Sequence, residues 1–366
     1  MSKLRPPLRL SWSYPGAISV SVTSNGDHIV ATLYPKDMVC LDLAGHLKWR
    51  VSGGFYDRLI VQGTEAFAKS ENSLFRIDVK TGELRTLPFD EHALVWVSED
   101  GATALSRIHK PDFAMEFERC SVQRIVLDRN VTELWKREDS GPMDCTNYFG
   151  YNIAVAGDRI FLPRSNAHLV CLELSSGETI WEADLNRTKE DPSVGVAADL
   201  RVSPVVFGNR VLAATPFGIA AFDADKGTLL WSNHVHAGPF APYSDRLYIV
   251  TGLNYTGYRV VDLNSGSTLL EREVSDDIAR AFGFEERVGL ESSLAVSETH
   301  TFVGDNVGRL WALERDTGEP VWFDHPETAT PYVAVRVPII SEGRLYINGF
   351  SMDPDRPQHL YCYEQA

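Results

Sequence analysis

The residues best suited to chemistry in this sequence are two histidines and a few scattered carboxylates. His234 and His236 are separated by one residue in the stretch SNHVHAGPFAP (232–242). Alternate residues of a strand face the same side, so two imidazoles at this spacing could ligate a metal ion. No third ligand has a recognisable spacing, and the alternative is a pair of ordinary loop histidines. In a reaction without a metal, His236 would be the general base and Glu286 or Asp144 the acid.

A second set of residues could form a polar binding site. Arg201 and Arg336 could bind a carboxylate or a phosphate, or they could equally neutralise Asp199 and Glu291. The candidate binding residues are Tyr56, Arg58, Asn147, Asn152, Arg201, Glu291, Tyr332 and Arg336. The sequence contains no GxSxG, HExxH, P-loop or dinucleotide-binding fingerprint. It therefore indicates candidate positions without defining a reaction.

A repeated pattern indicates which elements must position these residues. Its clearest copies are LVCLELSSGETIW (169–181), IAAFDADKGTLLW (219–231) and LWALERDTGEPVW (310–322). In each copy an acidic residue ends a short apolar run, a Gly follows in a turn, and a Trp follows that. The acidic residues are Asp42, Asp78, Asp128, Glu173, Asp223, Asp262, Glu314 and Glu364. Consecutive ones are separated by between 36 residues (78 minus 42) and 52 residues (314 minus 262).

Each part of the pattern has a physical role in a β-sheet. A Gly in the left-handed conformation closes a short hairpin, and the acidic side chain can accept hydrogen bonds from the turn amides. The residues in the strand after the turn are Trp49, Leu84, Trp135, Trp181, Trp231, Leu270 and Trp322. Two further short strands precede each acidic strand. Four-stranded units with this period are typical of a β-propeller, in which Trp would fill the space between neighbouring sheets, or blades.

The two ends of the chain complement each other in this scheme. The last unit has three strands and no Trp strand, whereas LRLSW (8–12) has Trp12 in the appropriate register. A propeller avoids exposed edges if its N-terminal strand completes the final blade. We therefore predict that Leu10 and Trp12 pair with the strand that holds Tyr361 and Tyr363.

The predicted fold class is all-β, an eight-bladed β-propeller with four-stranded blades that is closed by the N-terminal strand. Residues 1–366 would form a single domain, with a final blade made of residues 332–366 plus strand 8–13. Seven blades are the alternative, if the weakest unit, 91–136, is not a blade.

The cysteines fit a structural role. The chain has five, with no CxxC and no adjacent pair, which argues against a disulfide scaffold or a zinc site. Cys40, Cys171 and Cys362 share the position two before the acidic residue, where Ala221 and Ala312 stand in other copies. This position should be small and buried.

The pattern [AC]-[LF]-[DE]-x-x-[TS]-G-x-x-x-W resembles the PQQ-like, or quinoprotein-type, propeller repeat over nearly the whole chain. That family includes quinoprotein alcohol dehydrogenases and the outer-membrane assembly factor BamB. The resemblance implies eight blades around a central channel. For the dehydrogenases it also implies a vicinal cysteine pair and calcium-binding carboxylates, and for BamB a lipid anchor on an N-terminal Cys. Here no cysteines are adjacent and the first is Cys40, so we expect no PQQ and no metal cofactor.

Charge and composition restrict the partners. The 35 basic and 50 acidic residues leave a net charge of −15, which disfavours nucleic acid and anionic membrane surfaces. The charge is compatible with a basic protein partner, or simply with a well-solvated, soluble surface. The N-terminus has no apolar segment typical of a signal peptide, and no apolar run approaches the length of a membrane span. We therefore expect a cytoplasmic protein.

Unequal connections between the repeat units suggest where binding occurs. Long ones follow Trp135, Trp181, Leu270 and Trp322, and all would lie on one face of the ring. The leading hypothesis is a non-catalytic interaction propeller that binds a macromolecular partner there, possibly as an immunity-type inhibitor of a basic protein. The alternative is a lyase, hydrolase or isomerase that binds a small polar ligand in the central funnel. The oligomeric state is left open.

Overall fold

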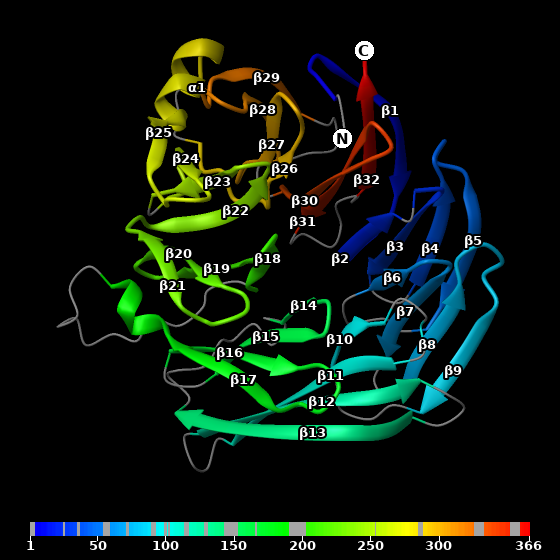
Figure 1. The fold of residues 1–366 in the computed structure, drawn as a ribbon. Helices are drawn as coiled ribbons and strands as arrows, with labels where there is room; N and C mark the ends of the chain where they lie inside the picture. The colour runs from blue at the N-terminus through cyan, green and yellow to red at the C-terminus, as the bar shows by residue number, and fades with distance from the viewer. Residues whose placement is uncertain are drawn as a thin grey trace.

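The computed structural model contains eight four-stranded antiparallel sheets arranged in a ring (Figure 1). It describes residues 4–24, 26–34, 37–53, 59–70, 73–88, 93–98, 101, 103–112, 117–127, 131–142, 153–164, 167–189, 203–252, 254–284, 288–325, 333–351 and 359–366. The prediction of eight blades is confirmed. The seven-blade alternative is wrong, because the weakest unit forms a complete sheet, β10–β13.

The blades follow the chain in order. Blade 1 consists of β2 (Ala17–Ser24), β3 (His28–Tyr34), β4 (Asp37–Asp42) and β5 (Leu47–Ser52), and blade 2 of β6 (Ile60–Gln62), β7 (Glu65–Ser70), β8 (Ser73–Asp78) and β9 (Leu84–Pro88). Blade 3 consists of β10 (Ala93–Val97), β11 (Thr103–Asp112), β12 (Phe117–Leu127) and β13 (Val131–Pro142), and blade 4 of β14 (Ala154–Ala156), β15 (Arg159–Arg164), β16 (His168–Glu173) and β17 (Thr179–Asp184). Blade 5 consists of β18 (Val205–Phe207), β19 (Arg210–Thr215), β20 (Gly218–Asp223) and β21 (Leu229–Asn233), and blade 6 of β22 (Ala237–Tyr243), β23 (Arg246–Thr251), β24 (Gly257–Asp262) and β25 (Thr268–Glu273). Blade 7 consists of β26 (Ala295–Val296), β27 (His300–Gly304), β28 (Leu310–Glu314) and β29 (Pro320–Asp324). Blade 8 consists of β30 (Val333–Ser341), β31 (Arg344–Ser351) and β32 (His359–Gln365), together with the N-terminal strand β1 (Leu8–Pro15).

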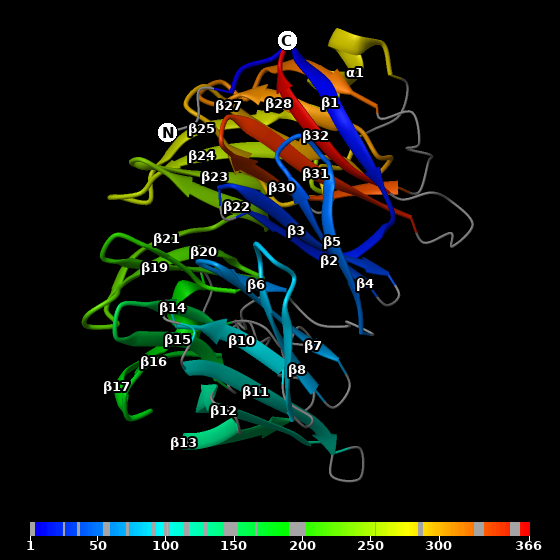
Figure 2. The same ribbon diagram turned by 90° about the vertical axis from the view of Figure 1, so that its right-hand side faces the viewer.

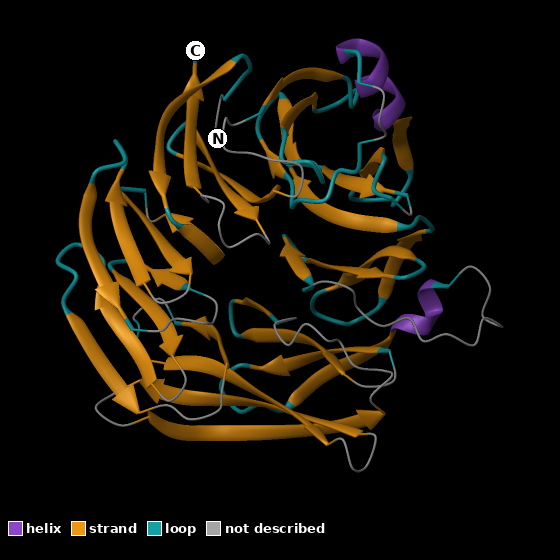
Figure 3. Ribbon diagram, turned by 180° about the vertical axis from the view of Figure 1, so that it is seen from behind, coloured by secondary structure: helices purple, strands orange, loops and turns teal. Residues whose placement is uncertain are grey.

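The described helices are short and lie at the periphery of the ring (Figure 3). They are α1 (Val274–Phe282), which follows blade 6, and the 3-10 helix η2 (Leu185–Thr188), which follows blade 4. Neither has the length and apolarity that a membrane-spanning helix requires.

The N-terminal strand closes the ring as predicted. β1 pairs antiparallel with β32, with Leu10 opposite Tyr363 and Trp12 opposite Cys362, and Figures 1 and 2 both show the two strands side by side. A register shift between Leu10 and Trp12 keeps the Trp in line with its counterparts. Buried apolar clusters occupy all eight spaces between blades, including the one between blades 8 and 1, where Tyr346 and Ile29 belong to the same cluster.

The acidic residue of the repeat organises its own turn. In blade 5 the Asp223 Oδ1 accepts hydrogen bonds from the amides of Asp225 and Lys226, both at 2.9 Å. The Asp223 carbonyl accepts from the amide of Gly227, which has a φ of +69°. Only glycine adopts this conformation without a steric cost, so the turn explains both the acid and the Gly.

The Trp of the repeat joins each blade to the next. The Trp181 indole lies against Gly227 of the next turn, where an added Cβ would come within 2.5 Å of the ring. Its Nε1 donates to the carbonyl of Ala224, the residue after the acidic one. The same bond occurs from Trp12 to Leu43, Trp49 to Val79, Trp135 to Leu174, Trp181 to Ala224 and Trp231 to Leu263, at 2.7–3.1 Å. We call this contact the Trp joint.

Trp322 occupies the same strand position but makes a different contact. It lies opposite Ala312, as Trp231 lies opposite Ala221. Blade 8 has no hairpin between β32 and β1, so Trp322 packs edge-on against Tyr363, with ring centroids 6.2 Å apart. The predicted equivalence of the tryptophans thus holds for strand position throughout, whereas the hydrogen bond requires a hairpin in the next blade.

At two junctions between blades, another residue makes the contact in place of Trp. Between blades 6 and 7 the register position is Leu270, and Tyr258 of the neighbouring strand β24 takes over the contact. The Tyr258 hydroxyl donates to the carbonyl of Arg315 at 3.1 Å, and Gly318 lies against its ring. Between blades 2 and 3, Arg76 donates to the carbonyl of Leu127 at 3.4 Å.

A second joint, which the sequence analysis missed, uses an arginine from the first hairpin turn of a blade. In blades 4, 5 and 6 this arginine reaches the residue two after the acidic one of the next blade. The pairs are Arg159 Nη1 to Asp225 at 2.6 Å, Arg210 Nη2 to Asn264 at 2.8 Å and Arg246 Nη1 to Asp316 at 2.8 Å. Because these pairs are partly exposed, each should contribute little alone.

The shared cysteine position is buried, as predicted. Cys40, Cys171 and Cys362 are fully buried free thiols that lie opposite Trp49, Trp181 and Trp12 across their sheets. Burial raises the pKa of the Cys171 thiol to about 11. A thiol with so high a pKa is a poor nucleophile, in keeping with a packing role.

Blade 7 contains a buried ion pair in its second hairpin. Asp305 is fully buried in the β27–β28 hairpin, and its Oδ2 accepts from Arg309 Nε at 2.6 Å and Trp311 Nε1 at 2.8 Å. Its Oδ1 accepts from the amide of Arg309 at 2.8 Å. The Arg309 guanidinium lies 4.3 Å from the centre of the Phe284 ring. Carboxylate and guanidinium are therefore both removed from water and satisfied by each other.

Acid should weaken the repeat turns. The amide and hydroxyl of Ser265 hold the pKa of Asp262 below its ordinary value of 3.8, and those of Thr81 do the same for Asp78. A carboxyl whose pKa is depressed by folding contributes stability above its unfolded pKa and loses it as the pH falls through the folded value. The urea midpoint should therefore be steady above about pH 5 and decline below pH 4. Urea titrations at several pH values measure this.

Asparagine variants test whether the carboxyls of the repeat turns cause the loss of stability below pH 4. Asp78→Asn/Asp262→Asn should show a shallower decline below pH 4 than the natural sequence. Asp158 is 84% exposed in a first hairpin turn, so Asp158→Asn should leave the decline unchanged. A double variant with the decline of the natural sequence would contradict the explanation.

Candidate functional site

The antiparallel order of each blade divides the connections between two faces of the ring. One face, here the turn face, carries the hairpin turns between the first and second and between the third and fourth strands. The opposite face, here the long-loop face, carries the remaining hairpins and the connections between blades. The repeat turns and both types of joint lie on the turn face.

Most residues predicted to form a site fall outside the described residues. These are Tyr56, Arg58, Asp144, Asn147, Asn152, Arg201, Glu286 and Tyr332. For them the sequence interpretation stays a prediction. The described ones are His234, His236, Glu291 and Arg336.

The two histidines lie in the bend between β21 and β22 and not on a strand. His234 is exposed, whereas His236 is half-buried, with its ring centre 6.4 Å from that of Tyr255. Within the described ranges, no three His, Cys, Asp or Glu side chains gather closely enough to hold a metal ion. Because neither histidine lies on a strand, the alternation assumed for a His-x-His pair does not apply here.

Glu291 and Arg336 lie in different blades. Glu291 is exposed in the connection that leads into β26, and its amide donates to the carbonyl of Gly304 at 3.0 Å. Arg336 lies on β30, the innermost strand of blade 8, opposite Asn348. The described residues thus place one candidate on the long-loop face of blade 7 and another on the inner strand of blade 8.

A pocket of about 580 Å³ opens on the turn face, where blades 5, 6 and 7 meet. The first hairpin turns of these blades form it, and Tyr248 and Arg315 complete its wall. The residues used below are Phe207, Tyr243, Asp245, Arg246, Glu298 and Arg315. None of these lining residues was among the site residues predicted from the sequence. Tyr243 and Phe207 occupy a turn position that is Ala156 in blade 4, and this difference was the available signal.

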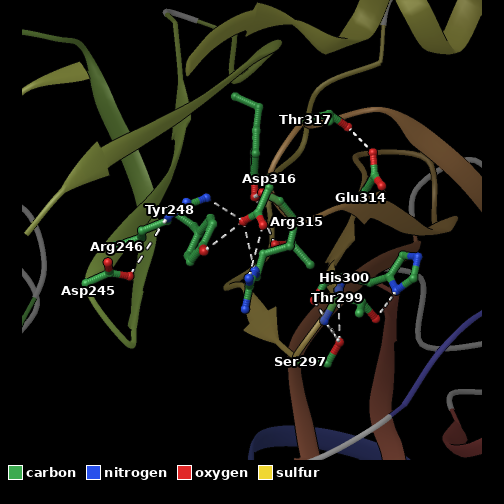
Figure 4. Close-up of polar contacts among 12 residues, drawn as sticks. Asp245, Arg246, Tyr248, Ser297, Thr299, His300, Glu314, Arg315, Asp316 and Thr317 are labelled. Carbon is green, nitrogen blue, oxygen red and sulfur yellow. Dashed lines mark hydrogen bonds and ion pairs between the residues drawn. The ribbon is translucent and has the colours of Figure 1, made fainter. Parts of the chain in front are cut away.

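Asp316 is the centre of the polar contacts beside the pocket (Figure 4). Its carboxylate accepts from Arg315 Nε at 3.0 Å and Nη2 at 3.1 Å, and from Arg246 Nη1 at 2.8 Å. The hydroxyl of Tyr248 approaches it at 3.4 Å. The hydrogen bonds from Arg315 hold the pKa of Asp316 below its ordinary value. Burial raises the pKa of Tyr248 to about 12, so this phenol stays protonated and can donate.

Aromatic rings and two further carboxylates complete the lining. The Arg315 guanidinium lies 5.3 Å from the centre of the Tyr243 ring. Asp245 is largely exposed, and among the described residues its ion-pair partner is Arg246, whose Nε lies 4.0 Å from the carboxylate. This arrangement can bind a polar or charged group between aromatic walls.

Fold and repeat chemistry together define a class of protein, the eight-bladed β-propellers built from quinoprotein-type repeats. The family model described as outer membrane protein assembly factor BamB matches residues 9–218, 122–281 and 217–352. The chain belongs to this family.

Individual relatives match shorter segments. The chain is 30% identical over 122 residues to the outer membrane protein assembly factor BamB of Alkalilimnicola ehrlichii, covering 32% of this chain and 31% of that protein. It is 22% identical over 154 residues to the quinohemoprotein alcohol dehydrogenase ADH IIB of Pseudomonas putida, covering 39% of this chain and 22% of that one. The chain therefore spans less than a third of either curated relative. The crystal structure of BamB from Moraxella catarrhalis has the same fold, with a TM-score of 0.71, 13% identity, and coverage of 97% of this chain and 99% of that one.

Proposed function

We propose that this chain is a non-catalytic scaffold that binds a protein partner. The observation that carries the proposal is the family match across the ring, because the matching model is described as an assembly factor. A shared fold alone is weak support for a shared function. The use of the repeated residues adds to it, since the Asp, Gly and Trp of the copies bond to their own turn or to the next blade. Partner recognition would then use residues that the copies do not share.

The partner should be basic and should bind the long-loop face. The net charge of −15 attracts a positively charged surface over several ångströms and speeds encounter. Glu291 is exposed on this face and is an acidic contact that can be tested. An immunity-type inhibitor of a basic protein is one form of the proposal. The cytoplasmic location and the exclusion of nucleic acid and membrane stay predictions from the sequence, as does the absence of PQQ and metal.

Isolation of the intact chain from its own cells under native conditions should recover a stoichiometric protein partner. Its association rate constant should fall by roughly tenfold or more as the salt concentration rises from low to high, because charge complementarity acts mainly on encounter. Stopped-flow or biosensor kinetics measure the rate. Recovery of no partner would overturn the proposal, and a rate independent of salt would remove the charge argument.

Charge reversals on the two faces test which face is used. Glu291→Lys should slow association, whereas Asp158→Lys on the turn face changes the net charge equally and should have the smaller effect. Equal slowing by both variants would contradict the long-loop face. The enzyme alternative with His236, Glu286 and Asp144 stays a prediction, because Glu286 and Asp144 lie outside the described residues.

A further inference from the structure

The pocket on the turn face is specific to the junction of blades 5, 6 and 7. The corresponding turn position is Ala156 in blade 4, Ser341 in blade 8 and the polar Gln62 in blade 2, whereas blades 5 and 6 carry the aromatic Phe207 and Tyr243. The volume of about 580 Å³ suits a small organic group, since ligand pockets typically have volumes of roughly 300–1,000 Å³. The pocket is therefore a feature of these blades and not of the repeat.

Both guanidiniums at the pocket are already paired. Arg315 and Arg246 share the carboxylate of Asp316, with contacts of 2.8–3.1 Å. Arg315 also lies over the ring of Tyr243. A ligand anion would have to compete with Asp316 for these cations, and Figure 4 shows them converging on it.

The carboxylates of the lining are much less engaged. The only ion pair of Asp245 in the described part of the chain is the 4.0 Å contact to Arg246. For Glu298, no hydrogen bond or ion pair of the side chain is found with any other described residue. The lining contains two positive side chains, Arg246 and Arg315, and two negative ones, Asp245 and Glu298. Because Asp316 beside the pocket pairs with both arginines, the two carboxylates of the lining stay available to a ligand.

The aromatic walls of the pocket favour a positively charged ligand, as the carboxylates do. Ring faces of Tyr and Phe attract cations, most strongly where water is partly excluded. The carboxylates and the aromatic faces are together complementary to a nitrogen cation with several N–H groups.

We propose that this pocket binds a guanidinium or alkylammonium group, either as a free small molecule or as an arginine or lysine side chain of a polypeptide. The site is separate from the partner surface proposed on the long-loop face, so either proposal can fail without the other.

The probes are N-acetyl-arginine amide and N-acetyl-lysine amide, which are single cations, and N-acetyl-glutamate amide as an anion of similar size. A peptide with one central arginine among neutral residues represents the polypeptide source. Isothermal titration calorimetry or ligand-observed NMR measures binding to the full chain. Binding of a free cationic amide would support a small-molecule source, and binding of the peptide alone would support a polypeptide source.

Paired variants identify the site. Asp245→Asn/Glu298→Gln should weaken cation binding by roughly tenfold or more. The control is Asp158→Asn/Glu342→Gln, which removes the same two charges from corresponding first hairpin turns of blades 4 and 8 and should bind like the natural sequence. Unfolding midpoints should match in both double variants, since these side chains are exposed or partly exposed.

Three results would overturn the inference. They are equal weakening by both double variants, no binding of any cationic probe, and preferential binding of the glutamate amide. The last would show that the paired arginines, and not the carboxylates, determine the ligand.

Discussion

Replacement of Asp305 by alanine is expected to lower the free energy of unfolding by about 3–5 kcal/mol. The change leaves the Arg309 guanidinium buried without its carboxylate and removes the acceptor of the Trp311 indole. An unpaired buried charge is among the costliest single changes, because neither water nor a partner solvates it. Denaturant unfolding followed by Trp fluorescence and by circular dichroism measures the loss.

A double variant separates the lost pair from a general defect of blade 7. Asp305→Ala/Arg309→Met removes both charges and keeps most of the apolar volume, so it should recover a substantial part of the lost stability. As a control, Glu182→Ala breaks the partly exposed pair with Arg164 and should cost at most about 1 kcal/mol. A loss near 1 kcal/mol for Asp305→Ala would mean that Arg309 reaches water, and the assignment would be wrong.

Truncation of Trp231 should cause the second large loss, also about 3–5 kcal/mol for Trp231→Ala. The side chain is only 7% exposed and packs with residues of blades 5 and 6, so its removal leaves a cavity between two sheets. Trp231→Phe keeps much of the volume but leaves the Leu263 carbonyl without its indole donor, and should cost about 1–3 kcal/mol. Urea unfolding of the two variants orders these contributions.

The neighbouring residue supplies a matched control. Leu230 lies on the same strand and is 45% exposed, so Leu230→Ala should change the stability by about 0.5 kcal/mol or less. If Leu230→Ala were as harmful as Trp231→Ala, the effect would belong to the strand and not to the joint between blades.

The architecture could be predicted because its determinants repeat. A left-handed Gly, an acid that accepts from turn amides and a Trp seven (49 minus 42) or eight (181 minus 173) residues after the acid are local requirements, so most copies contain them independently of their neighbours. The cysteine position and the pairing of β1 with β32 followed from the same register. The acidic strand recurs at separations of 36 to 52 residues, and even the weak third unit forms a blade, β10–β13.

Contacts between blades were harder to predict, because each depends on a partner in another copy, from 30 residues away (79 minus 49) to 70 residues away (316 minus 246). Between blades 6 and 7, Tyr258 on β24 makes the contact that a Trp at the position of Leu270 on β25 would have made. The repeat pattern gives no indication of this, because it places the residue on the other strand. The arginine joints escaped notice because the turn and its acceptor belong to different copies. The pocket was missed for the same reason, since Phe207, Tyr243 and Glu298 come from three blades and no segment of sequence contains them together.

Candidate site residues were the least predictable part. Several candidates come from the connections between strands, and the sequence does not determine how a long connection folds. The bend at His234 and His236 illustrates this, because two residues at strand spacing need not lie on a strand. The charges and residue types of the sequence indicated that a polar binding surface exists. Which side chains lie close together depends on how segments far apart in the sequence are arranged.

Completion of blade 8 by β1 brings both termini of the described chain together. The amide of Ala366 donates to the carbonyl of Pro7 at 3.2 Å. A tag, fusion or surface linkage at either terminus would hold the protein at the same sector. Blade 4, on the opposite side of an eight-membered circle, would then extend farthest from the support. Immobilisation through one end or the other should therefore give assays with nearly the same orientation.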